Sequence, residues 1–335
     1  MSLVGMLHHR KHPTSVRKAY PFAAVAKMEG IDFFYFSYRN INFSQKSIAG
    51  WVYERGQWLQ KNMNFPDVII NSSSPRTKKQ SEILNKLQYT SRFTSHSVGN
   101  KMTVYNKILK GSKFAEYLIP SLKAKTVRDV LGFLKKNPKA VFKPIKGNHG
   151  KNISFLEKKE DVIQVVQGKE YCVYKPDEFE KFISSQLNEH AYLIQSFVDC
   201  RTKAGLTYDF RLHVQKNGKG EWEITLIYPR VSGNSKLISN ISSGGYRAEL
   251  LPFLKEEFAE ESQRVYKELE NFALSFAEHF DSLYEHPFDE LGIDVGLEEQ
   301  HKLRIFEVNW RPGSKHREFE VARRLLPYCE YLANG

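Results

Sequence analysis

The stretch LRIFEVNWRPG, residues 303–313, places Glu307 and Asn309 among the apolar side chains of a strand-like run. Glu307 and Asn309 are two residues apart, so in a strand they project from the same face. A second run, LGIDV at residues 291–295, carries Asp294 between apolar residues. The two runs are typical of a hairpin, which would bring Asp294 opposite the other two side chains.

Two carboxylates and one amide oxygen at this hairpin form an all-oxygen set. Such a set suits Mg²⁺ that is shared with substrate phosphates. The alternative is an exposed strand face with ordinary charges. The apolar neighbours of Glu307 disfavour that alternative, because an unpaired carboxylate on a largely buried strand is unfavourable. We therefore predict that Asp294, Glu307 and Asn309 bind metal.

A strand lysine followed by a glycine-rich loop lies upstream, in AVFKPIKGNHGKN at residues 140–152. The glycines are too close together for a Walker A loop, and their spacing also differs from the dinucleotide-binding fingerprint. Kinase glycine loops precede their lysine, whereas Lys143 comes first here. Lys143 could reach phosphate oxygens while N–H groups of the loop close over them. An ordinary surface hairpin is the alternative.

Arginines on two further strand-like runs add positive charge. Asp209 and Arg211 share one face of the run at 208–215, and Arg230 follows the run at 222–229. Guanidinium groups stabilise a transferring phosphoryl group and hold carboxylates bidentately. A second polar glycine loop, Ser239 to Gly245, comes next. Taken singly, each arginine is more often part of a structural salt bridge.

The bulk composition is that of a globular protein. The chain has 335 residues, of which 41% are hydrophobic and 26% charged, enough for two or three packed subdomains. No apolar run approaches the roughly 20 residues of a membrane span, and the N-terminus lacks the pattern of a signal peptide. Three widely spaced cysteines favour buried, reduced thiols over disulfides or metal ligation. We expect a soluble, cytoplasmic protein with no membrane partner.

The formal net charge of +12 suits an anionic partner, such as a nucleotide, an acidic polymer or nucleic acid. The basic residues are scattered, with no arginine-rich arm, zinc-finger spacing or RNA-binding aromatic motif. A solvated basic surface is therefore favoured over a nucleic-acid footprint.

Hydrophobic periodicity predicts the other main elements. Strands are expected at 33–36, 68–71, 153–156 and 191–197, besides the runs already described. Helices are expected at 77–90, from about residue 100, at 126–136, at 176–188, as one long amphipathic helix at 253–280, and at the C-terminus. The strand at 153–156 would make the glycine-rich loop the connection of a hairpin.

In this order, the motifs resemble those of the ATP-grasp superfamily. They are Asn100-Lys101, Lys143 with its loop, Gln195-Ser196-Phe197, the D-x-R strand, Arg230, N-x-x-S-G-G, and a D…E-x-N-x-x-P-G pattern formed by Asp294, Glu307, Asn309, Pro312 and Gly313. Each motif is loose, but the ordered set, from about residue 95 to 320, is specific. The chain is most similar to the endospore-coat-associated YheC/YheD-like branch.

The resemblance implies an α+β, ATP-grasp fold, in which two α+β subdomains grip ATP, preceded by a small α/β domain. The corresponding divisions are residues 1–92 for the N-terminal domain, 93–195 for the first subdomain with its glycine-rich lid, and 196–335 for the second subdomain with the metal site.

The resemblance also implies roles for individual residues. Lys101 and Lys143 would contact ATP phosphates, and Gly147, Asn148, Gly150 and Lys151 would form a lid. Gln195, Ser196 and Phe197 would hold the adenine, with Asp199 near the ribose. Asp294, Glu307 and Asn309 would ligate two Mg²⁺ ions, and Arg211 and Arg230 would face the γ-phosphate and an acyl phosphate. Many relatives carry glutamate where Gln195 stands, which leaves nucleotide preference open.

The activity implied is ATP- and Mg²⁺-dependent ligation of a carboxylate to an amine through an acyl phosphate, with a role in spore coat formation. An ATP-grasp kinase acting on a hydroxyl is one alternative, and a non-catalytic coat protein that keeps the fold is another. The basic loops near Ser242-Ser243 and at 314–317 suit an acidic peptide or polymer as substrate.

Overall fold

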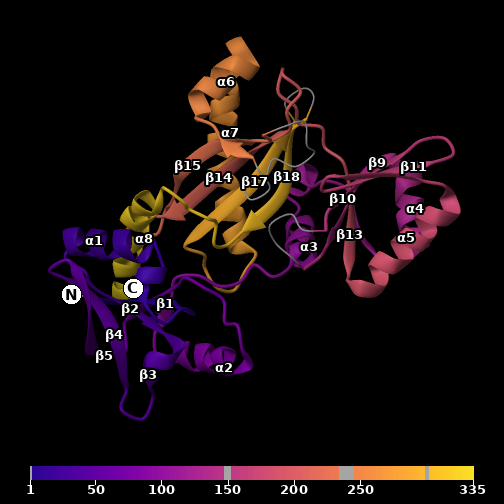
Figure 1. Cartoon of the computed structure of the whole chain (residues 1–335). Helices are drawn as coiled ribbons and strands as arrows, with labels where there is room; N and C mark the ends of the chain where they lie inside the picture. The colour runs from indigo at the N-terminus through magenta and orange to yellow at the C-terminus, as the bar shows by residue number, and fades with distance from the viewer. Residues whose placement is uncertain (1, 147–151, 234–244, 299–301) are drawn as a thin grey trace.

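The computed structural model describes residues 2–146, 152–233, 245–298 and 302–335 (Figure 1). The strands in these ranges form three sheets, of seven, six and five strands. Helices accompany each sheet, so the expected α+β class is confirmed. The predicted loops at 147–151 and 239–244 lie outside the described residues.

The N-terminal sheet has a parallel centre and an antiparallel side. Its strand order is β3-β4-β2-β1-β6-β7, with β5 paired to β4. β1, β2, β6 and β7 run parallel, whereas β3, β4 and β5 are antiparallel to their neighbours. The strands are β1 (Leu3–His8), β2 (Asp32–Ser37), β3 (Ile41–Asn42), β4 (Ser47–Glu54), β5 (Gln57–Asn64), β6 (Val68–Asn71) and β7 (Arg92–Phe93), and the helices are α1 (Ala19–Glu29) and α2 (Lys78–Leu87). The predicted strands at 33–36 and 68–71 and the helix at 77–90 are confirmed.

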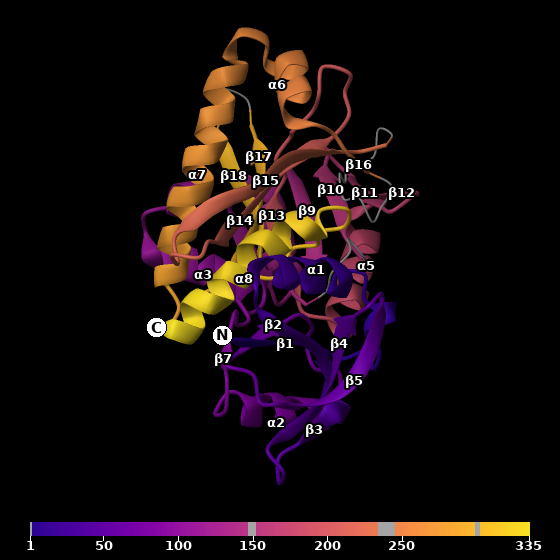
Figure 2. The same ribbon diagram turned by 90° about the vertical axis from the view of Figure 1, so that its left-hand side faces the viewer.

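The C-terminal helix, α8 (Glu318–Asn334), returns to this N-terminal sheet (Figures 1 and 2). Leu325 and Leu326 of α8 share a buried apolar cluster with Val4 of β1 and Phe22 of α1. α8 also contacts β14 and β15 of the third sheet. The helix therefore lies between the N-terminal sheet and the third sheet and joins them into one body.

The second sheet is antiparallel throughout, with the order β12-β11-β10-β9-β13-β8. Its strands are β8 (Ser121–Ala124), β9 (Lys139–Pro144), β10 (Ser154–Lys158), β11 (Ile163–Gln167), β12 (Glu170–Tyr174) and β13 (Tyr192–Ser196). Helices α4 (Val127–Lys136) and α5 (Pro176–Glu189) cover one face, with Phe142 and Phe179 in the shared core. β9 and β10 pair as the predicted hairpin. Because Ala140 and Phe142 face this core, Lys143 faces the other side of the sheet.

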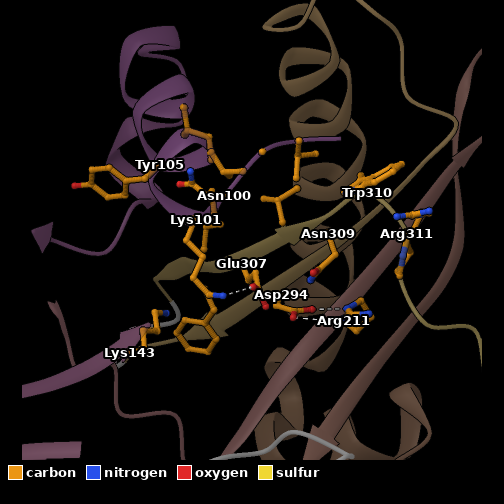
Figure 3. A pocket seen from close by; sticks show the side chains of 18 of the residues that line it. Asn100, Lys101, Tyr105, Lys143, Arg211, Asp294, Glu307, Asn309, Trp310 and Arg311 are labelled. Atoms are coloured by element: carbon orange, nitrogen blue, oxygen red, sulfur yellow. Dashed lines mark hydrogen bonds and ion pairs between the residues drawn. The ribbon is translucent and has the colours of Figure 1, made fainter. Parts of the chain in front are cut away.

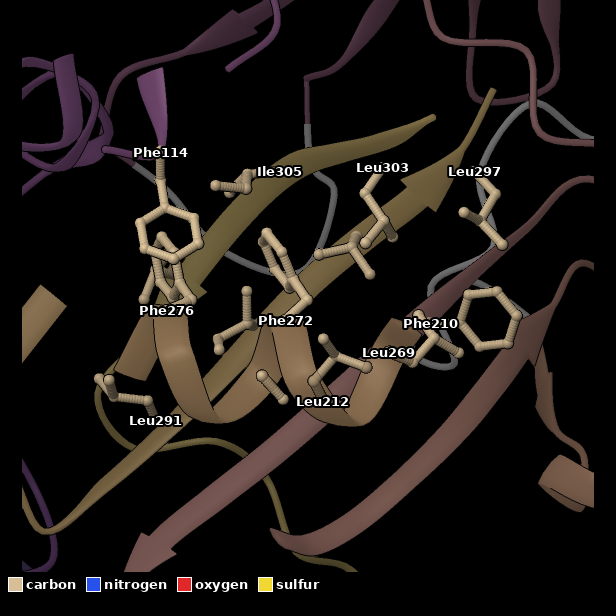
Figure 4. Close-up of a cluster of buried hydrophobic side chains, with 14 of the residues drawn as sticks. Phe114, Phe210, Leu212, Leu269, Phe272, Phe276, Leu291, Leu297, Leu303 and Ile305 are labelled. Atoms are coloured by element: carbon tan, nitrogen blue, oxygen red, sulfur yellow. The ribbon is translucent and has the colours of Figure 1, made fainter. Parts of the chain in front are cut away.

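The third sheet, also antiparallel, has the order β16-β15-β14-β17-β18. Its strands are β14 (Tyr208–Lys216), β15 (Trp222–Val231), β16 (Tyr246–Arg247), β17 (Glu290–Leu297) and β18 (Leu303–Asn309). Figure 4 shows the apolar side chains that pack between these strands and helix α7 (Ser262–Ser282). Leu212 of β14 and Leu291 of β17 lie close to Leu269 and Phe276 of α7.

The prediction of one helix at 253–280 is wrong. α6 (Leu250–Phe258) and α7 (Ser262–Ser282) are separate, joined by a short 3₁₀ turn, Ala259–Glu261, that begins with Ala259 at φ 47°. The break lets Phe253 of α6 pack edge-to-face on Tyr208 and Phe210, while α7 runs along the sheet. Periodicity does not detect it, because apolar residues on both helices fit a single helical stripe.

Helix α3 (Lys101–Gly111) joins the core of the third sheet, although its neighbours in sequence build the second. Val104 and Ile108 of α3 lie in this core, and Phe114 packs edge-to-face on Phe276 with a centroid distance of 5.2 Å. Lys101 is thereby brought to the third sheet. The divisions at residues 92 and 195 stay proposals; in space, α3 lies with the third sheet and α8 with the N-terminal one.

Two further expectations concern membranes and cysteines. None of the described helices has the length and apolar character needed to cross a membrane. All three cysteines are unpaired thiols, and Cys200 and Cys329 are buried as expected. Cys172 is exposed, which corrects the expectation of burial, because it lies on β12 at the edge of the second sheet.

Candidate functional site

A cavity of about 890 Å³ lies between the second and third sheets. Its walls come from α3, from β9 and β13 on one side, and from β14, β15, β17 and β18 on the other, together with the segment that follows β18. Figure 3 shows labelled polar side chains of α3, β9, β14, β17 and β18, and of the segment after β18, converging on one space. Most of the predicted site residues meet here.

The predicted metal ligands lie together on one wall. Asp294 of β17 is directly opposite Glu307 of β18, and Gly292 is opposite Asn309. Asp294, Glu307 and Asn309 all line the cavity. Within the described part of the chain, no group of three or more His, Cys, Asp and Glu side chains is arranged to hold a metal. A metal here would therefore need the amide oxygen of Asn309 and oxygens from a ligand.

Asp294 is held by two arginines. Arg211 bonds it bidentately, through Nε to Oδ1 and through Nη2 to Oδ2 at 3.0 Å, and Nη2 of Arg230 lies 3.0 Å from Oδ2. Burial opposes ionisation of this carboxyl group, but the two guanidinium groups outweigh burial and hold the pKa of Asp294 below its usual value. Asp294 is therefore a carboxylate at neutral pH.

Arg230 has a second carboxylate partner. Asp209 accepts from its Nε at 2.6 Å and from its Nη2 at 2.7 Å. Despite burial, Asp294 and Asp209 raise the pKa of Arg230 above its usual value. Arg211 and Arg230 thus form the salt bridges considered as the alternative above. Each guanidinium has five N–H donors. These bonds use Nε and Nη2, so the Nη1 donors can still face a ligand.

The two predicted phosphate-binding lysines approach the cavity from opposite walls. Nζ of Lys101 lies 3.2 Å from Oε1 of Glu307. Lys101 is the first residue of α3, and the side chain of Asn100 caps this helix by accepting from the N–H groups of Met102 at 2.9 Å and Thr103 at 3.1 Å. In the Asn100-Lys101 motif, the asparagine is thus the cap that fixes the start of α3 and, with it, the position of the lysine.

Lys143 donates to Oε1 of Gln195 at 2.8 Å, and Nε2 of Gln195 donates to Oγ of Ser121 at 2.9 Å. Loss of hydration, reinforced by the positive charge of Lys101, lowers the pKa of Lys143 to about 8, against the opposing effect of Glu307. A glutamate at position 195 would give this lysine an ion pair. The amide instead leaves the lysine charge without a counter-charge from that neighbour.

Of the predicted site residues that the structure describes, three do not line the cavity. Ser196 points to the other face of β13, where its Oγ is 2.7 Å from Oδ1 of Asn137. Phe197 packs edge-to-face on Phe155, and Asp199 pairs with Arg201 near the surface. From the segment predicted to hold adenine, Gln195 is the one side chain on the cavity wall. The adenine and ribose roles of Ser196, Phe197 and Asp199 stay predictions.

The lid residues Gly147, Asn148, Gly150 and Lys151 lie outside the described residues. Two arginines in the cavity wall were not predicted. Arg311 stacks on Trp310 at 3.8 Å, and Arg247 stacks on Tyr228 at 3.9 Å. Arg311 occupies a variable position of the E-x-N-x-x-P-G pattern. Its closeness in sequence to the predicted metal ligand Asn309 is the signal that could have identified it. Nothing comparable marks Arg247 in the sequence.

The chain matches known proteins over most of its length. Residues 90–332 match a family model described as YheC/D-like ATP-grasp. The chain is 25% identical over 322 residues to the endospore coat-associated protein YheD of Bacillus subtilis strain 168, covering 90% of this chain and 70% of that protein. It is also 25% identical to YheC of the same strain over 324 residues, covering 90% of this chain and 88% of that protein.

A solved structure of similar fold is that of N5-carboxyaminoimidazole ribonucleotide synthetase in complex with ADP. It aligns with a TM-score of 0.59 at 11% identity and covers 98% of this chain and 77% of that one. At this identity the likeness concerns the fold alone, and it confirms the predicted ATP-grasp fold. With the family match extending over residues 90–332, this chain belongs to the YheC/D-like ATP-grasp family.

Proposed function

We propose that this protein is an ATP- and Mg²⁺-dependent ligase that activates a carboxylate as an acyl phosphate and joins it to an amine. The observation that carries the proposal is the convergence on one cavity of two lysines, a carboxylate pair with an adjacent amide, and two ordered arginines. These groups match the needs of phosphoryl transfer, in which catalysis is mainly positioning and charge neutralisation.

The donor set fits magnesium in its chemistry. Asp294 and Glu307 supply carboxylate oxygens from opposite positions of one hairpin. Asn309 lines the same cavity and would add an amide oxygen to these two carboxylates. Hard oxygen ligands combined with phosphate oxygens are the usual environment of Mg²⁺. We propose that these three residues hold two Mg²⁺ ions, which would neutralise phosphate charge when bound.

The other residues would act on ATP and the acid. Lys101 and Lys143 would bind phosphate oxygens from opposite walls; the predicted lid at 147–151 lies outside the described residues. Arg211 and Arg230, held in place by Asp294 and Asp209, would orient the carboxylate and stabilise the charge that develops on the transferred phosphoryl group.

The reaction would proceed in two displacements. The substrate carboxylate attacks the γ-phosphorus, which gives an acyl phosphate and ADP. The amine then attacks the acyl carbon, and inorganic phosphate leaves as the amide forms. No protein nucleophile is needed, since positioned substrates supply both. The relatives YheC and YheD are named as endospore coat-associated, so we place the reaction in spore coat formation, in the cytoplasm.

Hydroxylamine trapping tests the proposal. The protein is incubated with Mg²⁺, ATP and hydroxylamine against a panel of amino acids, acidic peptides and cell-wall precursors, and hydroxamate and ADP are measured. We expect hydroxamate with at least one acid, and its loss in Glu307→Gln. Glu298→Gln is the matched control, because Glu298 follows β17 and pairs with Arg304 outside the cavity.

Two results would contradict the ligase. A stable phosphorylated product in place of hydroxamate would assign the protein as a kinase. Absence of both products across the panel, with no Mg²⁺-dependent binding of ATP, would assign it as a non-catalytic coat protein that keeps the fold.

A further inference from the structure

Arg247 and Arg311 differ from the other arginines of the cavity. Each lies with its guanidinium group stacked on an aromatic ring, Arg247 on Tyr228 at 3.9 Å and Arg311 on Trp310 at 3.8 Å. In the described parts of the chain, neither has a carboxylate within ion-pair distance. Stacking fixes the plane of a guanidinium, and the planar set of N–H donors matches the geometry of an oxyanion.

Arg311 is held by neutral groups. Its Nη1 lies 3.4 Å from the backbone oxygen of Asn71, the last residue of β6. Its Nη2 donates to Oγ of Ser74, in the segment that follows β6. The carboxylates of Glu290 and Asp289 act on it from beyond ion-pair distance, and Glu290 is 3.1 Å from His213. A partly buried cation that no carboxylate contacts directly is stabilised when an anion joins it.

The charge balance of the cavity leads to the same conclusion. Its lining contains eight basic residues, Lys101, Lys143, Lys146, Arg211, Arg230, Arg247, Arg311 and Lys315, and two acidic ones, Asp294 and Glu307. Asp294 and Asp209 already neutralise Arg211 and Arg230, and Glu307 pairs with Lys101. ATP neutralised by magnesium would leave part of the remaining positive charge unmatched.

The two stacked arginines lie on the same side of the cavity as the proposed metal set. Arg311 is two residues beyond Asn309, and Arg247 is directly opposite Arg230 in the pairing of β15 and β16. Nη1 of Arg247 lies 3.5 Å from the backbone oxygen of Lys315, in the segment that carries Arg311. In Figure 3, Arg311 and Trp310 lie across Asp294 and Asn309 from Lys101 and Lys143. Phosphates at the lysines would therefore leave this end of the cavity to the second substrate.

We propose that Arg247 and Arg311 bind a second oxyanion of the acid substrate, separate from the carboxylate that is activated. The substrate class is then an acid with at least two anionic groups, and we assign it as a polycarboxylate such as an acidic oligopeptide. The part of this assignment that concerns activation depends on the proposed ligase function. The binding of an oxyanion by the two arginines does not.

Isothermal titration with a tetraglutamate peptide tests the site, with tetraglutamine as the uncharged control. We expect tetraglutamate to bind the wild type and tetraglutamine not to bind. Arg247→Gln and Arg311→Gln should each lower the affinity for tetraglutamate by about tenfold or more, the usual loss for a charge-assisted hydrogen-bond pair. Arg304→Gln is the matched control, because Arg304 lies on β18 but pairs with Glu298 outside the cavity. It should bind tetraglutamate as the wild type does.

Two further measurements separate loss of the oxyanion site from a general loss of folding or of nucleotide binding. Arg311→Lys keeps the charge but not the planar fork, and it should fold as the wild type does and lose part of the affinity. Affinity for ADP with Mg²⁺, measured in every variant, should stay within about twofold of the wild type, since neither arginine is among the residues proposed to bind phosphate. A fall in ADP affinity in parallel with tetraglutamate affinity would overturn a separate site.

The remaining outcomes separate the two proposals. Tetraglutamate binding that depends on Arg247 and Arg311, without any ADP binding, would sustain the oxyanion site and contradict the ligase. If ADP binds but tetraglutamate does not bind at millimolar concentration, the oxyanion site alone is overturned. The same holds if ADP binds and tetraglutamate binds the two glutamine variants as tightly as the wild type. Binding of inorganic phosphate at these arginines, with none of tetraglutamate, would overturn the polycarboxylate assignment.

Discussion

Asp294 on β17 lies directly opposite Glu307 on β18, yet the two carboxylates have different partners. Asp294 is buried and bonded by two arginines, whereas Glu307 is partly exposed and has Lys101 3.2 Å away. One position of the hairpin is therefore fixed by a buried network, and the other is free to respond to a ligand. This difference sets different expectations for their replacement.

Replacing Asp294 should affect stability as well as activity. Asp294→Asn removes the negative charge between Arg211 and Arg230 and leaves buried guanidinium charge uncompensated, so we expect a loss of about 3–5 kcal/mol in the free energy of unfolding. Urea denaturation measures it. Asp199→Asn, at an exposed ion pair with Arg201, should change stability by less than about 1 kcal/mol. Equal effects of the two variants would contradict the buried network.

Lys143 should make nucleotide binding depend on pH. Its pKa of about 8 means that the free protein loses this positive charge as pH rises through that value. A phosphate favours the charged form, so affinity for ADP with Mg²⁺ should be full below pH 8 and fall above it. Lys143→Arg stays protonated and should abolish this fall. An unchanged decline in the arginine variant would assign the pH dependence to another group.

Asp289 should make the folded protein less stable as pH rises toward neutrality. Burial and the neighbouring Glu290 raise the pKa of its carboxyl group to about 7, against hydrogen bonds that lower it. Between the unfolded value near 4 and this folded value, the native state binds more protons than the unfolded state, so the free energy of unfolding decreases as pH rises. Above pH 7 the full loss is present.

Asp289→Asn should therefore flatten the stability profile between about pH 4 and 7 and raise the free energy of unfolding at pH 8 by about 1–4 kcal/mol. The amide can keep the acceptor role toward the N–H of Glu290, where the native bond is 2.8 Å. Asp161→Asn, at an exposed position, should preserve the wild-type profile. Urea denaturation across this pH range is the measurement, and a profile as steep as that of the wild type would refute the role of Asp289.

The core of the third sheet should be sensitive to truncation of Phe276. This side chain is fully buried on α7 and packs against Phe114, Phe272 and Phe280. Phe276→Ala should reduce the free energy of unfolding by about 3–5 kcal/mol, from lost transfer energy and a remaining cavity. Leu251→Ala, where the side chain is half-exposed, should cost under about 1 kcal/mol. Comparable losses in thermal or urea unfolding would mean that Phe276 is not part of the core.

The break between α6 and α7 should favour glycine. Ala259 has φ 47° and ψ −118°, a conformation that is unfavourable for a residue with a Cβ atom. Ala259→Gly should raise the free energy of unfolding by about 1 kcal/mol. Ala24→Gly, at an exposed position inside α1, should lower it by about 1 kcal/mol. Destabilisation by glycine at both positions would mean that residue 259 is helical and that α6 continues into α7.

Local pattern gave much of the fold correctly. The hairpin of β17 and β18 was predictable because apolar residues two apart around Asp294 and Glu307 specify strands and the short connection specifies their pairing. The β9–β10 hairpin followed from the same reasoning. The α6–α7 break was missed, because the short turn between the two helices does not disturb the apolar spacing on either side of it. The β4–β5 hairpin was not identified, since its side chains mix polar and apolar residues along both strands.

The candidate site divides in the same way. Glu307 and Asn309 could be assigned to one face from their spacing, and Lys143 from the alternation of β9. Arg247 could not be found, because its neighbours Tyr228 and Lys315 are far from it in sequence. The side chain of Ser196 was expected in the site, but it falls on the opposite face of β13 from Gln195, as alternation along a strand requires.

The sequence by itself determined the family, the hairpin that carries Asp294 and Glu307, and the lysine in front of the glycine-rich loop, because these depend on residue type and short spacing. Only the tertiary structure decided which charges are matched. It paired Arg211 and Arg230 with buried carboxylates, and it left Arg247 and Arg311 stacked on aromatic rings without a carboxylate partner in the described residues. The reason is physical: the energy of a charged group depends on its hydration and its partners, and these come from strands and helices that meet only when the chain is folded.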